Sequence, residues 1–255
     1  MRGARSTLTR VWMAVGAVAL FCAFLMLGTW QVQRRAWKLD LIARVEQRVH
    51  APAVAPPPQA EWAGVTSDNS EYRHVRVSGT FLNDSETLVQ ALTDLGAGFW
   101  VLTPLRLGDG TVVLVNRGFV PPERRERGAH GAGESATPAT VTGLLRITEP
   151  RGAFLRRNDP VGNRWYSRDV QAIAAARGLS GVAPYFIDAE ASEGDRQRLV
   201  AASHGASGES AGPIGGLTVI NFRNTHLVYA ITWYGLALMV VGGAWIVIRE
   251  ERRRA

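Results

Sequence analysis

The stretch 11–28, VWMAVGAVALFCAFLMLG, decides the fold, because it carries no charged residue. A second uncharged stretch, LVYAITWYGLALMVVGGAWIVI, occupies residues 227–248. Each is close to the roughly 20 apolar residues that an α-helix needs to cross the hydrocarbon of a bilayer. We therefore predict a membrane protein whose two transmembrane helices flank a long central segment.

The first apolar stretch has an alternative interpretation as a cleaved signal peptide, because Arg2, Arg5 and Arg10 form a basic region ahead of it. The residues after the stretch do not favour cleavage. The bulky Trp30 stands where a small residue is expected before the cut. We therefore favour a retained anchor.

Basic residues near the helix ends set the orientation of a membrane protein. They lie outside both predicted helices at Arg2, Arg5, Arg10, Arg249, Arg252, Arg253 and Arg254, but also just past the first helix at Arg34, Arg35 and Lys38. Long loops are translocated largely regardless of their charge, which weakens the second signal. We predict that both termini are cytoplasmic. The lack of an Arg- and Ser-rich transit segment favours a bacterial plasma membrane over a mitochondrial one.

These features together predict six segments. They are a cytoplasmic N-terminus (1–10), a transmembrane helix (11–30), a helical extension with a proline-rich linker (31–58), a β-rich extracytoplasmic domain (59–224), a second transmembrane helix (225–248) and a basic cytoplasmic tail (249–255).

Charge and cysteine content exclude two classes of function. The formal net charge is +7 and the pI is near 10.4, but the arginine clusters flank the predicted helices, where topology and anionic lipid explain them. Nucleic-acid binding is therefore not predicted. The one cysteine, Cys22, lies in the first apolar stretch, so a copper site of paired thiolates is excluded.

The central segment has the short alternating runs of an antiparallel sheet. Strands are expected at 72–81, 87–92, 99–107, 111–115, 140–147, 183–188 and 217–220. Asp109-Gly110 lies in a hairpin turn, and Asp169 caps a short helix over 169–177. Residues 121–138 and 201–216 are expected to be loops. The predicted fold class is an α+β membrane protein, with two transmembrane helices flanking a mainly antiparallel β domain.

The central segment carries no motif of a known catalytic class, neither GxSxG, HExxH, a P-loop nor a Rossmann glycine pattern. Its histidines, His50, His74, His130 and His204, lack the spacing of metal ligands. His74 is interpreted as a half-exposed strand residue. An enzyme is therefore not predicted, although an activity that tracked a single residue of the outer domain would revive that class.

The start of the second apolar stretch has a histidine that needs a partner or a purpose, because ionisable groups at membrane depth are costly. On a helix, His226 shares a face with Ala230, Trp233 and Ala237. The two helices are antiparallel, so Trp30 and Gln31 lie at about the depth of His226.

A histidine, aromatic rings and nearby arginines would suit a flat apolar macrocycle with propionates, whose iron the imidazole binds. Arg34 and Arg35 would reach the anionic groups. Two alternatives stay open. A boundary histidine can be solvated among interfacial aromatic residues, and the two arginines can serve lipid phosphate.

Five blocks in order along the chain resemble the surfeit-locus protein family. They are Gly28, Trp30, Gln31, Arg34, Trp37, Lys38; Tyr72, Val75, Val77, Gly79, Phe81; Pro104 and Gly110 with 113–121; Arg164, Trp165, Tyr166, Asp169, Pro184, Phe186; and Asn224, His226, Leu227, Tyr229, Ala230, Thr232, Trp233, Tyr234. Two residues depart from the family pattern. Phe119 replaces a tryptophan, and Thr225 replaces a polar amide or acid that would partner His226.

The resemblance implies an assembly factor for haem-copper cytochrome c oxidase that binds haem a and aids its insertion into, or stabilisation in, subunit I. Haem a synthase is a further candidate partner. The resemblance assigns the iron ligand to His226, and helical spacing and depth add Trp233, Tyr229, Trp30 and Arg34 as neighbours of the haem. Asn116 and Arg117 are interpreted as a structural turn. The alternative function is a cofactor-free membrane scaffold that docks oxidase subunits.

Overall fold

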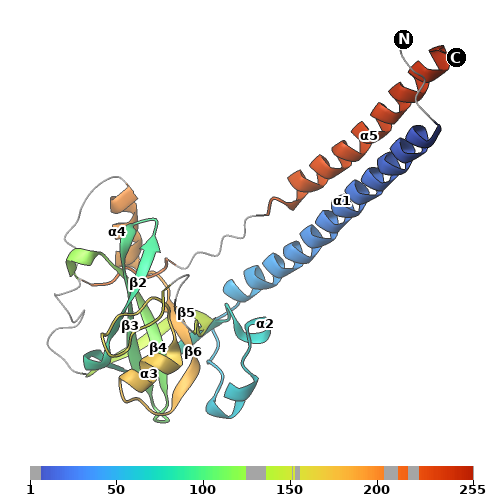
Figure 1. Ribbon diagram of the computed structural model, residues 1–255. Helices are drawn as coiled ribbons and strands as arrows, with labels where there is room; N and C mark the ends of the chain where they lie inside the picture. Colours follow the sequence, from blue (N-terminus) through green and yellow to red (C-terminus); the bar gives the residue numbers. More distant parts are fainter. Residues whose placement is uncertain are drawn as a thin grey trace. The chain divides into compact units, whose positions relative to one another are not determined.

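The computed structural model describes residues 7–124, 136–150, 152, 156–203, 212–217 and 224–254. The chain divides into two compact units, one made of the residues up to Val45 together with those from Ile220 onward, and the other of Glu46–Val219. The elements are labelled in Figure 1. In chain order they are α1 (Thr7–Val49), η1 (Gln59–Gly64), α2 (Ser67–Ser70), β1 (His74–Leu82), η2 (Asn83–Ser85), β2 (Thr87–Thr93), β3 (Gly96–Leu107), β4 (Val112–Val120), η3 (Pro122–Arg124), β5 (Ala136–Ile147), α3 (Val170–Ala176), β6 (Val182–Ala189), α4 (Glu193–Ser203) and α5 (His226–Arg254).

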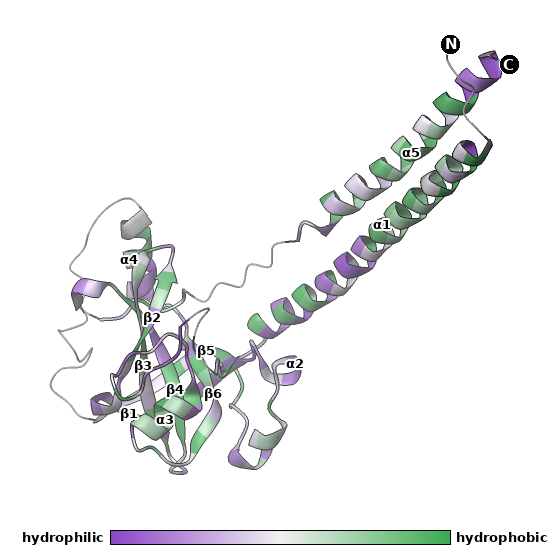
Figure 2. Ribbon diagram, in the orientation of Figure 1, coloured by the Kyte–Doolittle hydropathy of each residue, from purple (hydrophilic) through white to green (hydrophobic). Residues whose placement is uncertain are grey.

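Helices α1 and α5 are both long and apolar enough to cross a membrane. Figure 2 shows their apolar lengths, and the polar residues that follow in the second part of α1 and at the end of α5. The predicted helical extension is present, because α1 is one continuous helix of 43 residues. An ion pair of 3.6 Å between Arg10 Nε and Glu251 Oε1 joins the start of α1 to the end of α5, so the two helices are antiparallel.

The second unit contains a closed barrel. The strand order in its sheet is β1-β5-β6-β4-β3-β2, and β1 also pairs with β3. This last pairing closes β1, β3, β4, β6 and β5 into a five-stranded Greek-key barrel, from which β2 extends along β3. A closed barrel leaves few unpaired strand edges.

The prediction of a mainly antiparallel sheet is confirmed, with one parallel exception. β4 and β6 pair in parallel, and Leu114 lies opposite Phe186. Parallel neighbours need a long crossover connection, and here it consists of β5 and α3. Short local patterns in the sequence do not reveal such a pairing.

The barrel has an apolar core on each side of its central strands. The inner core is made of Val75, Val77, Phe81, Leu105, Val113, Val115, Val141, Leu145, Ala183, Tyr185 and Ile187. A second core of Val89, Leu102, Leu114, Trp165, Val170, Ile173 and Phe186 lies between the sheet and α3. β4 is therefore buried on both faces, which explains its nearly continuous apolar run.

The predicted hairpin turn at Asp109-Gly110 and the predicted helix cap at Asp169 are both confirmed. Asp109 Oδ1 accepts a bond of 2.9 Å from the Thr111 backbone N–H in the β3–β4 hairpin, and Gly110 has a φ of +85°. Asp169 caps α3 by accepting from the Ala172 N–H at 3.1 Å. The proline-rich segment is extended, and Val54 forms a parallel bridge to Val75 of β1.

Several predicted boundaries were wrong. Asn116 and Arg117 lie within β4 rather than in a turn after it, because the strand continues to Val120. β5 begins at Ala136, inside the loop predicted over 121–138, of which residues 125–135 lie outside the described ranges.

The second predicted loop, 201–216, begins inside a helix. Helix α4 continues to Ser203 and was not predicted at all. A reciprocal cap begins it, in which Asp195 Oδ2 accepts from the Ser192 N–H at 2.8 Å and Ser192 Oγ accepts from the Asp195 N–H at 3.1 Å. Residues 204–211 lie outside the described ranges. So do 218–220 of the last predicted strand, whose remaining residue, Leu217, is not in a strand.

The close pairing of β1 with β3 predicts that replacing Gly79 by a larger residue lowers the stability of the barrel. A Cβ at Gly79 would lie 2.3 Å from the backbone oxygen of Arg106 in β3, so Gly79→Ala must separate the strands. We expect the variant to lose about 1–3 kcal/mol of unfolding free energy. Urea unfolding of the full-length protein in detergent, followed by near-ultraviolet circular dichroism, measures this.

The matched control is Gly108→Ala, because no atom lies within 4 Å of a Cβ at that position. Equal urea midpoints for the two variants would contradict the close β1–β3 approach.

Candidate functional site

Helices α1 and α5 contact each other along a seam of residues spaced three and four apart. On α1 these residues include Phe24, Gly28 and Gln31; on α5 they include His226, Ala230, Trp233 and Ala237. Ala230 and Ala237 are each 2% exposed, and the rings of Phe24 and Trp233 stack with centroids 5.8 Å apart. Such spacing, with small residues at the contact, is how helices pack closely in a membrane.

Gly28 sets how closely the helices approach. A Cβ there would lie 2.7 Å from the Tyr234 ring, so only glycine admits this tyrosine. The Thr29 hydroxyl lies 3.2 Å from the Tyr234 hydroxyl, which adds a hydrogen bond beside the contact. The register of the two helices is therefore fixed within two turns of Gln31.

Gln31 is the partner of His226. The distance between His226 Nδ1 and Gln31 Oε1 is 2.7 Å, which is a hydrogen bond across the seam. The loss of a polar neighbour at Thr225 therefore does not leave the imidazole without a partner. Nearby, the side-chain oxygen of Asn224 is buried and has no hydrogen-bond partner among the described residues.

The contact between Thr29 and Tyr234 also tells the two flanks of the helix pair apart. Each of these residues follows a seam residue by one position, and one position rotates a side chain by about 100°. The residue after a seam residue and the residue before it therefore lie on opposite flanks. Because the helices are antiparallel, the residues that follow seam residues on α1 and on α5 lie on the same flank of the pair. The 3.2 Å contact between the Thr29 and Tyr234 hydroxyls shows this.

The opposite flank, which we call the open flank, is reached by residues that precede the seam. Trp30 precedes Gln31, and Tyr229 precedes Ala230. Arg34 precedes Arg35, which follows Gln31 by four positions and so lies on the same face of α1. Trp30 is 55% exposed and Tyr229 54% exposed, so neither ring is covered within the helix pair. The guanidinium of Arg34 lies 4.0 Å from the Trp37 ring centroid, a cation–π contact one turn along α1.

The five residues predicted to form the site thus occupy two places. His226 and Trp233 lie in the seam, where Gln31 and Phe24 hold them. Trp30, Arg34 and Tyr229 project from the open flank. The described residues include no group of three or more histidine, cysteine or acidic side chains that could hold a metal ion. The chemistry offered is therefore one imidazole beside aromatic surface and an arginine.

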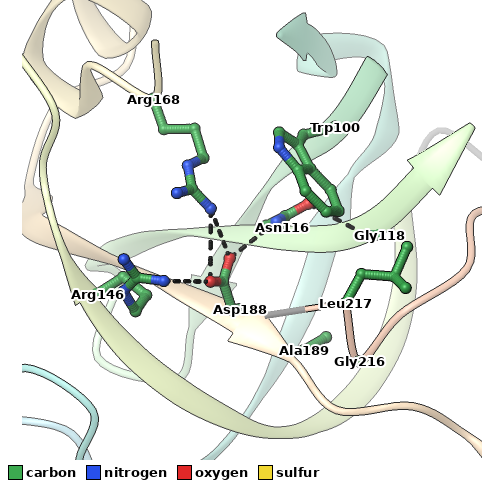
Figure 3. Close-up of a pocket in the computed structure, with 9 residues that line it drawn as sticks. All are labelled: Trp100, Asn116, Gly118, Arg146, Arg168, Asp188, Ala189, Gly216 and Leu217. Carbon is green, nitrogen blue, oxygen red and sulfur yellow. Dashed lines mark hydrogen bonds and ion pairs between the residues drawn. The ribbon is translucent and has the colours of Figure 1, made fainter. Parts of the chain in front are cut away.

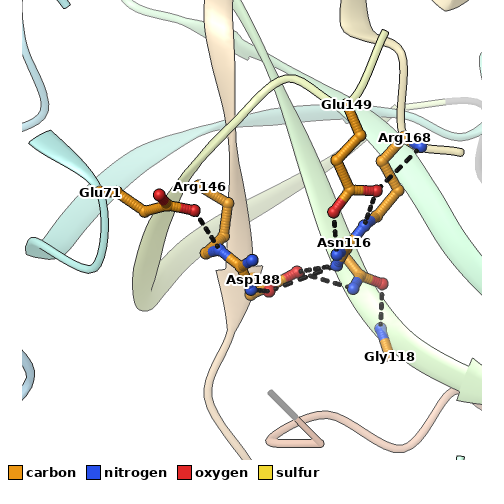
Figure 4. Close-up of polar contacts among 7 residues, drawn as sticks. All are labelled: Glu71, Asn116, Gly118, Arg146, Glu149, Arg168 and Asp188. Carbon is orange, nitrogen blue, oxygen red and sulfur yellow. Dashed lines mark hydrogen bonds and ion pairs between the residues drawn. The ribbon is translucent and has the colours of Figure 1, made fainter. Parts of the chain in front are cut away.

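The barrel contains a second polar cluster, which the sequence did not predict. Its centre is the Asp188 carboxylate at the end of β6, which is 3% exposed (Figure 4). Arg146 Nη1 donates to it at 3.1 Å, Arg168 Nη1 at 3.2 Å and Asn116 Nδ2 at 2.8 Å. A buried charge with several charge-assisted donors is well satisfied.

Two further carboxylates complete the cluster from its ends. Glu71 accepts from Arg146 Nε at 3.3 Å, and Glu149 accepts from Arg168 Nε at 3.1 Å. Burial alone would raise the pKa of Glu149, but the hydrogen bonds and charge of Arg168 outweigh it, so the pKa is lowered. Burial opposes the charge of Arg168, but Asp188 and Glu149 outweigh it and raise its pKa.

A cavity of about 210 Å³ lies against this cluster (Figure 3). It is lined by Trp100, Asn116, Gly118, Arg146, Arg168, Asp188, Ala189, Gly216 and Leu217. The charged side chains in its wall are bonded to one another, so they serve first to hold β4, β5 and β6 together. Gly118 has a φ of +132°, and a Cβ there would lie 2.2 Å from the Ile214 backbone.

His74 makes more contacts than its interpretation as a half-exposed strand residue suggests. It lies partly buried in β1, as predicted, but protein oxygens lie against both ring nitrogens. Nδ1 lies 2.7 Å from the Ala51 carbonyl oxygen and Nε2 lies 2.8 Å from Glu190 Oε1. With a protein oxygen against each ring nitrogen, the imidazole is enclosed by its own chain on both sides.

Fold and sites together define a class of protein: in the sequence, a β-barrel unit lies between two long apolar helices, and polar side chains gather at the helix seam and at one end of the barrel. The SURF1 family model matches residues 18–238. Surfeit locus protein 1 of Mus musculus is 37% identical over 226 residues, covering 82% of this chain and 67% of the relative.

Two further relatives give the same result. Surfeit locus protein 1 of Homo sapiens is 37% identical over 230 residues, covering 83% of this chain and 69% of the relative. The SURF1-like protein of Monosiga brevicollis is 36% identical over 238 residues, covering 88% and 83%. This chain belongs to the SURF1 family, which is known for cytochrome c oxidase assembly factors.

The buried cluster predicts a large cost for removing its centre. Asp188→Ala leaves Arg146 and Arg168 facing each other without the carboxylate between them, and breaking a buried pair in this way costs about 3–5 kcal/mol. Urea unfolding of full-length protein should show this loss. The control is Glu193→Ala, which removes an ion pair with Arg196. The side chains of Arg196 and Glu193 are 62% and 74% exposed, so the urea midpoint should change little. Similar midpoints for the two variants would contradict a structural role for Asp188.

The lowered pKa of Glu149 predicts a loss of stability in acid. Its carboxylate is favoured more in the folded than in the unfolded chain, whose ordinary value is 4.5. The contribution of Glu149 to the free energy of unfolding is therefore present above pH 4.5. It is lost as the pH falls through the lower pKa that Glu149 has in the folded chain. Urea midpoints between pH 7 and about pH 3 should fall less in Glu149→Gln than in wild type. The exposed Glu61→Gln should follow the wild-type curve, and a Glu149→Gln curve parallel to wild type would contradict the linkage.

Proposed function

We propose that this protein is an assembly factor for haem-copper cytochrome c oxidase that binds haem a as cargo and aids its insertion into, or stabilisation in, subunit I. Membership of the SURF1 family supports the oxidase as client. The hydrogen bond between His226 and Gln31 carries the haem proposal, since an imidazole whose Nδ1 is engaged has Nε2 left to bind iron.

The helix pair suits such a cargo in chemistry. The open flank supplies two exposed aromatic rings, Trp30 and Tyr229, for an apolar macrocycle, and Arg34 for a propionate. The buried Asn224 oxygen, which has no partner within the described ranges, is a further acceptor close to His226 along the chain. One imidazole with aromatic surface fits haem better than it fits a bare metal ion, which needs several protein ligands.

The setting we propose is a bacterial plasma membrane, with both helices spanning it, both termini cytoplasmic and the barrel outside. The arginines at the ends of α1 and α5 support this orientation. The relatives named above are eukaryotic. Haem a synthase is the proposed donor of the cargo.

The second candidate function is a cofactor-free scaffold that docks oxidase subunits. Two exposed apolar residues favour it, because Leu92 is 86% exposed and Val161 is fully exposed on the barrel unit. Isolated apolar residues at a surface are common, so this observation is weaker than the His226–Gln31 bond.

The test is an absorbance spectrum of detergent-purified protein made together with the haem a biosynthetic enzymes. We expect a stoichiometric haem a signal in wild type that His226→Ala loses or shifts, because the imidazole is the iron ligand. His50→Ala removes an exposed histidine outside the proposed site and should keep the wild-type spectrum.

Other results would separate the two functions. Wild-type protein without haem a would overturn the carrier proposal. Oxidase that co-purifies equally well with wild type and His226→Ala would then support the scaffold.

A further inference from the structure

The bond between Gln31 and His226 has a definite chemical polarity. The carbonyl oxygen of a glutamine side chain accepts hydrogen bonds and cannot donate them. Since Gln31 Oε1 lies 2.7 Å from His226 Nδ1, the proton of the bond must be on Nδ1. A neutral imidazole carries one ring proton, so Nε2 keeps its lone pair.

We propose that Gln31 is a positioning residue that holds His226 in the Nδ1–H tautomer and so presents Nε2 as the ligand atom. The proposal rests on the proposed haem function and adds to it the residue that sets the ligand's protonation. Partners of this kind orient metal-binding histidines and raise their basicity.

The packing around the seam gives Gln31 the rigidity this role requires. Gly28, one turn earlier on α1, contacts the Tyr234 ring, and Phe24 stacks on Trp233. These contacts fix the register of α1 against α5 on one side of the bond. The Gln31 amide is therefore held across from His226 by the backbone, not by its own flexible side chain alone.

His74 provides a contrast within the same chain. Acceptors lie against both of its ring nitrogens, the Ala51 carbonyl oxygen at 2.7 Å and Glu190 Oε1 at 2.8 Å. That arrangement ties an imidazole into a structure and leaves no nitrogen for a ligand. At His226 the bond to Gln31 engages Nδ1, which is the arrangement of a ligand with an orienting partner.

The first experiment measures the tautomer without haem. Full-length protein with 15N-labelled histidine is reconstituted in lipid nanodiscs, and the His226 signals are assigned by their loss in His226→Ala. We expect the proton on Nδ1 in wild type and in Gln31→Glu, which keeps an acceptor. Gln31→Leu should show the tautomer mixture of an unconstrained imidazole. Gln33→Leu, a change at an exposed neighbour on α1, should match wild type.

The second experiment measures haem binding by the same variants. Loss of an orienting partner typically weakens metal binding about 10–100-fold, so we expect that loss in Gln31→Leu and near wild-type affinity in Gln33→Leu. Gln31→Glu should retain the haem but lower its midpoint potential, because a carboxylate at Nδ1 makes the imidazole more electron-rich. A residue that only packs the helices would not shift the potential in this way.

The outcomes distinguish this proposal from the one on which it rests. If wild type binds no haem a, the carrier function fails while the tautomer measurement still tests the contact. If wild type binds haem a but Gln31→Leu leaves both tautomer and affinity unchanged, the positioning role of Gln31 is overturned. A wild-type proton on Nε2 would overturn it as well.

Discussion

The carboxylate of Asp188 is the interaction on which the barrel depends. It lies where β4, β5 and β6 meet, and it receives donors from each of the other two strands and from the segment before α3. One buried negative charge thus joins parts of the chain that are far apart in sequence. Buried ion pairs are not a strong general source of stability, but once such a charge is buried the removal of one partner is costly. The cluster therefore specifies which strands meet there.

In the helix unit, too, a partly buried polar side chain has its partner on another segment of the chain. Helices α1 and α5 are long and apolar enough to cross a membrane, and in hydrocarbon, which offers no hydrogen bonds, a polar side chain needs a partner on the neighbouring helix. Gln31 and His226 satisfy each other, and Gly28 brings the helices close enough for that to happen. The close packing at Gly28 and the Gln31–His226 bond both require the same register of α1 against α5. Each contact therefore supports the other.

Much of the architecture could be predicted from local patterns. The apolar stretches, the Asp109-Gly110 hairpin and the Asp169 cap each act within a few residues, and the structure shows them where they were expected. The parallel β4–β6 pairing and the Asp188 cluster depend on partners up to 72 residues apart, which no local pattern reveals. Helix α4 was missed because its alanine- and serine-containing end was interpreted as the start of a loop. At the helix seam, depth placed Gln31 beside His226, but only coordinates show the bond. The roles of the site residues remain predictions.

The parallel pairing also governs the order in which the barrel can form. β1 finds its main partner only when β5 has been made, and β4 finds one of its neighbours only when Val182–Ala189 has been made. Until then the nascent chain has strands with open edges, which is the state in which β-proteins associate wrongly. The barrel can therefore close only after β6 has been made, when α1 has long been synthesised. A first helix inserted in a membrane would hold the growing chain at one place until the barrel closes.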